Sequence, residues 1–138
     1  MVWTPRKVTE DRAARHTLRG VMDSWPALCI SGFSDDRGAE HELERKALLS
    51  ATSEFHVAIE FLSLGSPGVK RSTGFNSYIL KHRAERWAFE IPALECSYIQ
   101  NGVMIAAAIA FGLGVKREPR SGRRNLSIDA IINLKGLS

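Results

Sequence analysis

The 14 residues from Gly102 to Val115 carry no charge, and this stretch constrains the fold more than any other feature. As a helix, it would rise about 21 Å, well short of the ~30 Å hydrocarbon core of a membrane. A helix that is apolar on every side is typical of a protein interior. It also lacks the Arg, Asn and Gln side chains that read base edges, which argues against a recognition helix. We therefore predict a buried central helix and no membrane anchor.

Small residues recur at every fourth position of this stretch, at Gly102, Ala106, Ala110 and Gly114. On a helix they would form one stripe with almost no side chain. Such a stripe lets a neighbouring backbone approach closely, which is a common need of tightly packed helices. We predict a close neighbour along this side of the central helix.

The N-terminal third predicts two helices around a strand. Residues 9–25 have apolar residues at helical spacing, and Pro26 would end that helix. Residues 27–33 are short and apolar and contain Gly32, which predicts one buried strand. The acidic and small residues that follow are typical caps of a second helix, which we expect to begin near Asp36.

Residues 54–64 fit two interpretations. A four-residue step that starts at Leu43 and reaches Phe55 favours a helix, whereas the alternation of apolar residues from Phe55 to Phe61 is typical of a strand. We favour a helix that continues to about Leu64 and keep the strand as the alternative.

The C-terminal half predicts a loop, a helix and two strands. Residues 66–74 carry Gly, Ser and Pro and indicate an exposed loop, and a helix over 76–90 would be capped by Asn76 or Ser77. Residues near 114–118 and 125–132 would pair around a basic turn, and residues 27–31 would complete a small sheet. We predict a single mainly helical α+β domain, residues 1–138, with a central buried Ala-rich helix and a small β-sheet or hairpin.

Four polar side chains share one face of the helix expected over 76–90. Tyr78, Lys81, His82 and Glu85 stand at i, i+3, i+4 and i+7. The phenol, amine, imidazole and carboxylate could bind a metal or pass a proton. An ordinary polar face, with a Lys81–Glu85 ion pair and Tyr78 packed against the core, explains the same pattern.

The histidines do not predict a metal site. His41, His56 and His82 each precede a glutamate by three or four positions, but the order is the reverse of the Glu-x-x-His pairs found in two-metal helical bundles. Zinc-ligand spacing, a phosphate-binding loop, a nucleophile elbow and a dinucleotide fingerprint are all absent from the sequence. We expect no metal and no cofactor.

Residues 77–114 resemble a pattern in small, mostly uncharacterised bacterial proteins. The pattern is Ser-Tyr-x-x-Lys-His-x-x-Glu, followed by Tyr-x-x-Asn-Gly, an alanine-rich helix and a glycine. Position 79 is often glycine in that pattern and is Ile79 here. The resemblance implies no reaction. It marks a candidate polar site made of Tyr78, Lys81, His82, Glu85, Tyr98 and Asn101.

Charge is divided unevenly along the chain. The net charge is +4, yet residues 1–69 sum to −2, because they hold 8 basic and 10 acidic residues, while residues 70–138 sum to +6, from 11 and 5. A basic half suits a polyanion or an acidic protein partner, although a solvated surface that only keeps the protein soluble has the same composition. The candidate contacts are Lys70, Arg71, Arg83, Arg86, Lys116, Arg117, Arg120, Arg123 and Arg124.

Two classes of function compete. The first is a small non-enzymatic nucleic-acid-binding protein that contacts mostly phosphates. The alternative is a protein-binding module or inhibitor that docks an acidic or nucleic-acid-binding partner. An enzyme that uses Lys81, His82 and Glu85 is a third. Cys29 and Cys96 lack metal or redox spacing, and the first residues lack the apolar core of a secretion signal, so we expect free thiols in the cytoplasm.

Overall fold

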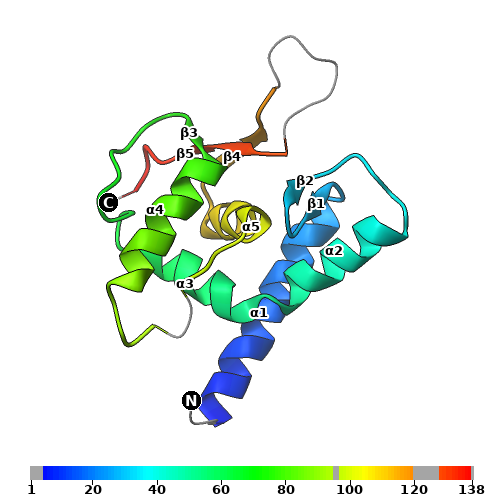
Figure 1. The fold of residues 1–138 in the computed structure, drawn as a ribbon, viewed down its shortest axis with the longest axis horizontal. Helices are drawn as coiled ribbons and strands as arrows, with labels where there is room; N and C mark the ends of the chain where they lie inside the picture. Colours follow the sequence, from blue (N-terminus) through cyan, green and yellow to red (C-terminus); the bar gives the residue numbers. More distant parts are fainter. Residues whose placement is uncertain (1–4, 95–96, 120–127, 138) are drawn as a thin grey trace.

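The computed structural model describes residues 5–94, 97–119 and 128–137. Helices make up most of this part of the chain (Figure 1). The elements are α1 (Pro5–Ser24), β1 (Leu28–Cys29), β2 (Gly32–Phe33), α2 (Ala39–Ser50), α3 (Thr52–Ser63), β3 (Phe75–Asn76), α4 (Ser77–Phe89), α5 (Asn101–Phe111), β4 (Gly114–Arg117) and β5 (Ala130–Asn133). The fold is mainly helical α+β, as predicted.

Helix α5 is the centre of the fold. Helices α1, α3 and α4 pack around it, with the sheet of β3, β4 and β5 on another side (Figure 1). Every side chain from Val103 to Ala108 is fully buried, which confirms the predicted core helix. The helix ends at Phe111, because Gly112 adopts the left-handed conformation with a φ of 96°. The last apolar residues, from Gly114 onward, belong to β4.

The larger sheet has the strand order β3-β5-β4, with antiparallel neighbours throughout. Ile132 of β5 is fully buried and pairs with Phe75 on one side and Val115 on the other. The pairing of β4 with β5 confirms the predicted pair of strands, with β4 near the expected residues 114–118. The second strand was predicted over residues 125–132, whereas β5 begins only at Ala130, and residues 125–127 lie outside the described residues. The expectation that residues 27–31 join β4 and β5 is wrong, because β3 occupies the third place in that sheet.

Residues 27–33 form a hairpin of their own, so the prediction of one strand is also wrong. Leu28 pairs with Phe33 and Cys29 pairs with Gly32, so the chain reverses direction over the two residues between Cys29 and Gly32. Gly32 has a φ of 126°, and a Cβ there would overlap the carbonyl oxygen of Ile128. The tight reversal therefore depends on a contact with a segment far away in the sequence.

Helices α2 and α3 follow one another with a break at Ala51, whose ψ of 50° leaves the helical region. Helix α2 begins at Ala39, later than the predicted start near Asp36. The Asp36 carboxylate accepts the N–H of Gly38 at 3.0 Å and so closes a turn before the helix. Residues 54–63 lie within α3, which confirms the favoured helix over the strand.

Candidate functional site

Helix α4 carries more of the residues that the sequence singles out than any other element, and a side-chain cap fixes its start. The Asn76 Oδ1 atom accepts the backbone N–H of Tyr78 at 2.8 Å and that of Ile79 at 3.1 Å, as predicted for this residue. The Asn76 side chain therefore fixes the residue at which α4 begins. From it, the positions of Lys81 and Glu85 follow by helical spacing.

Lys81 lies at the centre of a compact group that we call the Lys81 cluster, formed by Tyr78, Lys81, His82, Glu85 and Tyr98. Its residue is only 6% exposed. The Lys81 Nζ atom lies 3.3 Å from Glu85 Oε2, 5.4 Å from the ring centre of Tyr78 and 5.2 Å from that of Tyr98. A carboxylate and two aromatic faces thus compensate an ammonium withdrawn from water.

Glu85 joins α4 to the segment that leads into α5. Its Oε2 atom accepts the backbone N–H of Ile99 at 2.9 Å, and its Oε1 atom lies 3.0 Å from His82 Nδ1. Both carboxylate oxygens are therefore engaged. Glu85 therefore fixes the position of α4 relative to the segment that precedes α5.

Tyr78 and Tyr98 are exposed at the edge of the Lys81 cluster, at 48% and 61%. The expectation that Tyr78 packs against the core is therefore wrong. Its ring instead meets the edge of His82, with 4.5 Å between ring centres and 86° between planes. The sequence pattern correctly groups these side chains, and the exposed rings are what the group presents to solvent.

Asn101 lies apart from the Lys81 cluster, inside a buried set of hydrogen bonds that we call the polar node. Ser77 Oγ donates to Asn101 Oδ1 at 2.8 Å and accepts the N–H of Ala130 at 2.9 Å. Asn101 Nδ2 in turn donates to Ser31 O and to Asp129 Oδ1, each at 3.0 Å. Asn101 is 6% exposed and ties α4, α5, β5 and the β1–β2 hairpin together. Its role here is structural.

Cations from α4 and from the loop before β3 lie on the same side of the molecule. Lys70 and Arg71 come from the loop before β3, and Arg83 and Arg86 from the outer face of α4, and all four are exposed. Within the described residues, none of the four has an ion pair or a side-chain hydrogen bond. Their charges are therefore available to solvent and to a partner.

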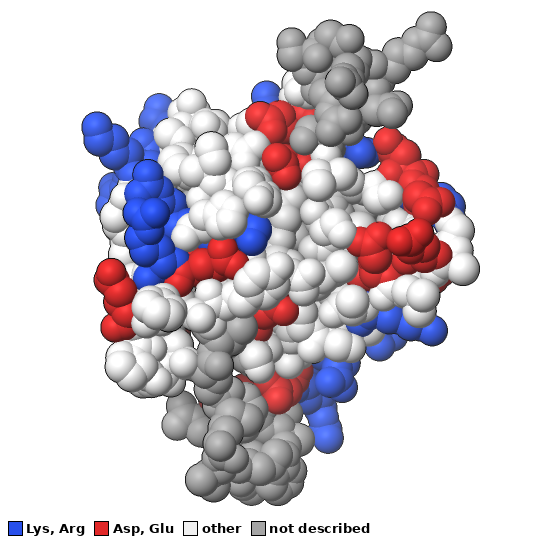
Figure 2. Space-filling model, viewed as in Figure 1, with Lys and Arg blue, Asp and Glu red and all other residues white. Residues whose placement is uncertain are grey.

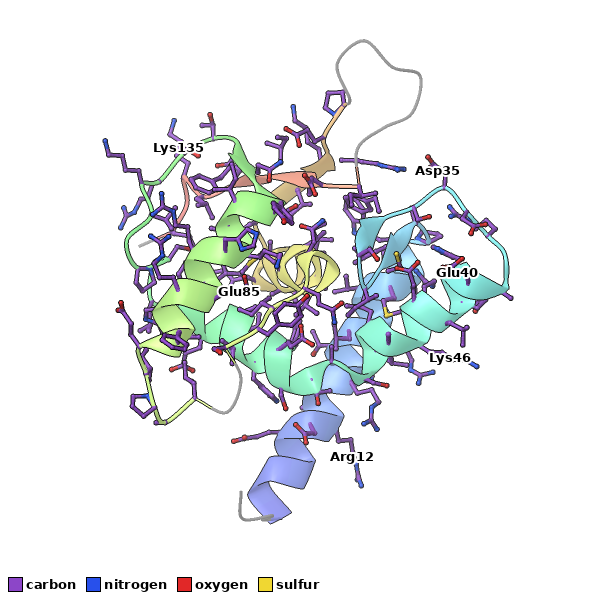
Figure 3. All side chains as sticks on the ribbon, viewed as in Figure 1. Arg12, Asp35, Glu40, Lys46, Glu85 and Lys135 are labelled. Atoms are coloured by element: carbon purple, nitrogen blue, oxygen red, sulfur yellow. The ribbon has the colours of Figure 1, made fainter. Side chains whose placement is uncertain are left out.

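Figure 2 shows blue side chains gathered over α4 and the loop before β3, at the left, and a large red patch on the opposite side, over α2 and the turn before it. Lys135 adds to the basic side (Figure 3), because Leu134 donates its N–H to Ser72 O at 2.7 Å and so holds the end of the chain against the loop. Asp35 and Glu40 lie at the far side. We call Lys70, Arg71, Arg83, Arg86 and Lys135 the α4 basic surface.

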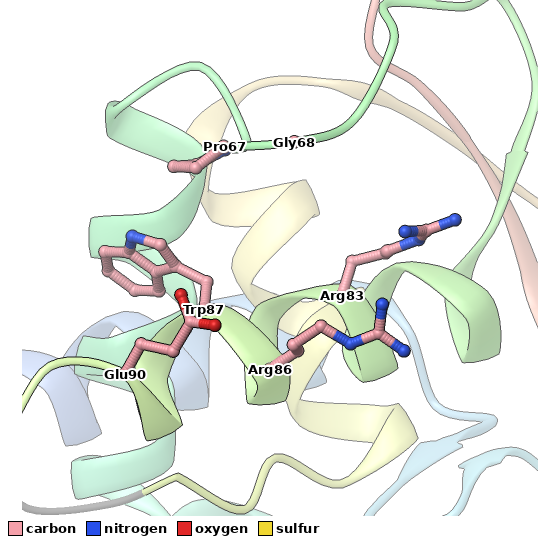
Figure 4. Close-up of a pocket in the computed structure, with 6 residues that line it drawn as sticks. All are labelled: Pro67, Gly68, Arg83, Arg86, Trp87 and Glu90. Carbon is pink, nitrogen blue, oxygen red and sulfur yellow. The ribbon is translucent and has the colours of Figure 1, made fainter.

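A pocket of about 230 Å³ opens within this surface (Figure 4). Arg83 and Arg86 form one wall, Trp87 and Glu90 the other, and Pro67 and Gly68 lie across them. The Trp87 ring is anchored by Phe61, whose ring centre is 5.5 Å away. Sequence reasoning missed Trp87 and Lys135. The i, i+4 spacing from Arg83 could have shown Trp87, whereas Lys135 joins only through tertiary contacts.

Arg117 was predicted to contact a partner, and its geometry points to a structural role instead. Its guanidinium donates to Asp35 Oδ1 at 2.7 Å and to Oδ2 at 3.3 Å, and it lies over the Phe33 ring at 5.8 Å. The Arg117 side chain is only 14% exposed. This hydrogen bond lowers the pKa of Asp35 below its ordinary value, and the charges of Arg117 and Arg37 act in the same direction, against an opposing effect of desolvation.

The remaining basic residues are only partly described. Lys116 is exposed on β4 and lines a second pocket of about 330 Å³ with residues of β5 and Thr73. Arg120, Arg123 and Arg124 lie outside the described residues. The candidate site is therefore built on α4 and the loop before β3.

The histidines have separate surroundings. His41 is buried, with Nε2 3.1 Å from Pro26 O, His56 lies 3.6 Å from Asp11, and His82 belongs to the Lys81 cluster. The described residues contain no group of three or more metal-ligating side chains. Cys29 is a free buried thiol, and burial raises its pKa, while Cys96 lies outside the described residues.

Among the described residues, no helix is both long and apolar enough to cross a membrane. Comparison of the chain with protein-family models, curated proteins and solved structures found no match.

Proposed function

We propose that this chain binds nucleic acid without acting on it chemically, and that the α4 basic surface contacts the phosphates. The observation that supports this proposal is the convergence of exposed cations from three segments, with no ion-pair partner for Lys70, Arg71, Arg83 or Arg86 among the described residues. Lysine and arginine contacts to phosphates supply most of the affinity of non-specific nucleic-acid binding.

The distribution of acids supports the same proposal. Asp35 and Glu40 lie on the side of the molecule away from α4 (Figure 3). A polyanion would be repelled from that side and attracted to the α4 side, so one face is favoured for approach. Glu90 is the one acid in the Trp87 pocket, and it stands on the wall opposite the two arginines.

A second candidate function is docking of an acidic protein. It is supported by two apolar side chains on the same helix, Ile79 at 52% exposed and Phe89 at 79% exposed. Exposed apolar side chains beside arginines are common in protein interfaces. The phosphate-binding proposal is stronger because one wall of the pocket and the loop before β3 together contribute four exposed cations, none with an ion pair among the described residues.

The test compares two charge-matched double variants. Arg83→Ala with Arg86→Ala removes two cations from the α4 basic surface. Arg12→Ala with Arg19→Ala removes two exposed cations from α1, and Arg12 lies far from α4 (Figure 3). Fluorescence anisotropy with labelled DNA and RNA is measured over a range of salt concentrations.

We expect the α4 variant to bind more weakly to every sequence. The slope of log K against log salt should fall by about 0.9 per lost phosphate contact on duplex and about 0.7 on a single strand. The α1 variant should resemble the wild type. Equal losses in both variants would reduce the effect to net charge and overturn the proposal. If the wild type binds no nucleic acid even at low salt, the acidic-protein candidate takes its place.

A further inference from the structure

The Lys81 cluster places two aromatic rings beside the cations. Tyr78 belongs to the first turn of α4, and Tyr98 to the segment before α5, yet the same ammonium lies about 5 Å from both ring centres. The two rings are therefore neighbours on the surface, although twenty positions separate them in the chain. At 48% and 61% exposed, both offer ring surface to solvent.

An ion pair between Lys81 and Glu85 holds these two rings in place. Burying a lysine is costly, and Lys81 is tolerated because Glu85 and the two rings compensate its charge. Glu85 is itself fixed by the N–H of Ile99, the residue next to Tyr98. The ion pair therefore orients Tyr98 relative to Tyr78 and leaves Lys81 too buried to contact a phosphate itself.

A row of side chains on α4 leads from Tyr78 toward the arginines. Tyr78, His82 and Arg86 stand at i, i+4 and i+8, which places them in a row of about 12 Å along the helix. Arg83 and the pocket at Trp87 adjoin the far end of that row. A ligand that follows α4 would meet aromatic faces first and cations next.

From this juxtaposition we propose that the partner is a single strand of nucleic acid, whose bases stack on Tyr78 and Tyr98 while its phosphates meet the α4 basic surface. This inference rests on the proposed function and narrows it. In a duplex the bases already stack on one another, so exposed rings would gain nothing from it. On a single strand, stacking on aromatic side chains accepts any base and is worth about 1–3 kcal/mol per base.

The experiment uses four probes of equal length: oligothymidylate, oligouridylate, a DNA duplex, and an abasic strand that keeps the sugars and phosphates. The variants are Tyr78→Ala and Tyr98→Ala, with Tyr78→Phe and Tyr98→Phe as controls that keep the rings. Circular dichroism and thermal melting confirm folding, which truncation of an exposed ring should leave intact.

We expect the wild type to bind oligothymidylate more tightly than either the duplex or the abasic strand. Each alanine variant should lose about 5- to 150-fold for oligothymidylate, the fold-change that corresponds to one stacked base. Its salt slope and its affinity for the abasic strand should stay unchanged, and the phenylalanine variants should bind like the wild type. The ratio of oligothymidylate to oligouridylate affinity shows whether the strand is DNA or RNA.

Two results would overturn the inference while the proposed function stands. One is equal wild-type affinity for the single strand, the duplex and the abasic strand, with loss only in Arg83→Ala/Arg86→Ala. The other is loss of affinity in the alanine variants for all probes alike, which would mark the rings as structural. Failure of the wild type to bind any probe would overturn both proposals. The comparison of the four probes on the wild-type protein needs no variant, so it remains decisive even if a variant misfolds.

Discussion

Substitution of Gly102 by alanine tests how the central helix is packed. Gly102 lies in the first turn of α5 against the β1–β2 hairpin, and its N–H donates to Ile30 O at 2.9 Å. A Cβ at this position would overlap the carbonyl oxygen of Cys29 and stand 2.8 Å from the oxygen of Ile30 and 2.9 Å from the carbonyl carbon of Cys29. These are backbone atoms, so no side-chain rotation can make room.

The magnitude follows from three contributions. Overpacking costs about 1–3 kcal/mol, and weakening of the hydrogen bond to Ile30 adds about 0.5–1.5 kcal/mol. Alanine recovers at most about 1 kcal/mol through its better helix propensity. We therefore expect Gly102→Ala to lower the free energy of unfolding by about 1–3 kcal/mol. For a chain of this length, each kcal/mol lowers the melting temperature by about 4 °C.

Gly20→Ala is the matched control. Gly20 lies inside α1, is exposed, and would meet no atom within 4 Å of an added Cβ. It should stabilise the protein by about 0.4–1 kcal/mol, because alanine restricts the unfolded chain. Thermal and urea unfolding of both variants measure the contrast. A Gly102→Ala protein that is as stable as the wild type would refute close docking of the hairpin on α5.

Two further predictions concern the core and the charges. Ala106→Leu places a larger side chain at a fully buried position and should cost about 1–3 kcal/mol in urea unfolding, whereas Ala110→Leu, at a half-buried position, should cost less; equal stability of Ala106→Leu and wild type would contradict the packing of α5. Asp35 has a lowered pKa because Arg117 donates to it, so its contribution to stability is present above its ordinary pKa of 3.8 and is lost as the pH falls through the lower folded-state value. Asp35→Asn should therefore be less stable than the wild type at neutral pH, and the difference should shrink in acid; a difference that does not change with pH would contradict the ion pair.

The features that could be predicted from sequence are those that local chemistry decides. The cap at Asn76 and the common face of Tyr78 and Glu85, which both contact Lys81, need only helical geometry, and both are present. The central helix follows from a run that no charged residue interrupts. In each case the interacting residues are within one or two helical turns of one another.

The features that sequence could not show depend on distant partners. Residues 27–33 turn back at Ile30 and Ser31, and the next residue, Gly32, lies against Ile128 and Asn101. Arg117 has its charge taken up by Asp35, 82 positions away, and nothing in the basic turn indicates this. The two-residue strand Phe75–Asn76 exists only through its pairing with β5. In each case the local sequence pattern shows which residue types are present, but it does not show which distant residue they contact.

The polar node has a consequence for the order in which the chain assembles. Ser77 and Asn101 are already side by side once α4 and α5 have packed, yet the hydroxyl still needs the N–H of Ala130 and the amide still needs Asp129. A growing chain that ends before these residues would carry incompletely paired polar groups in its interior, which is costly. Docking of β5 is therefore the step that completes the interior. A strand shifted by one residue would offer Ser77 the wrong amide, so this single hydroxyl also sets the register in which the last strand joins.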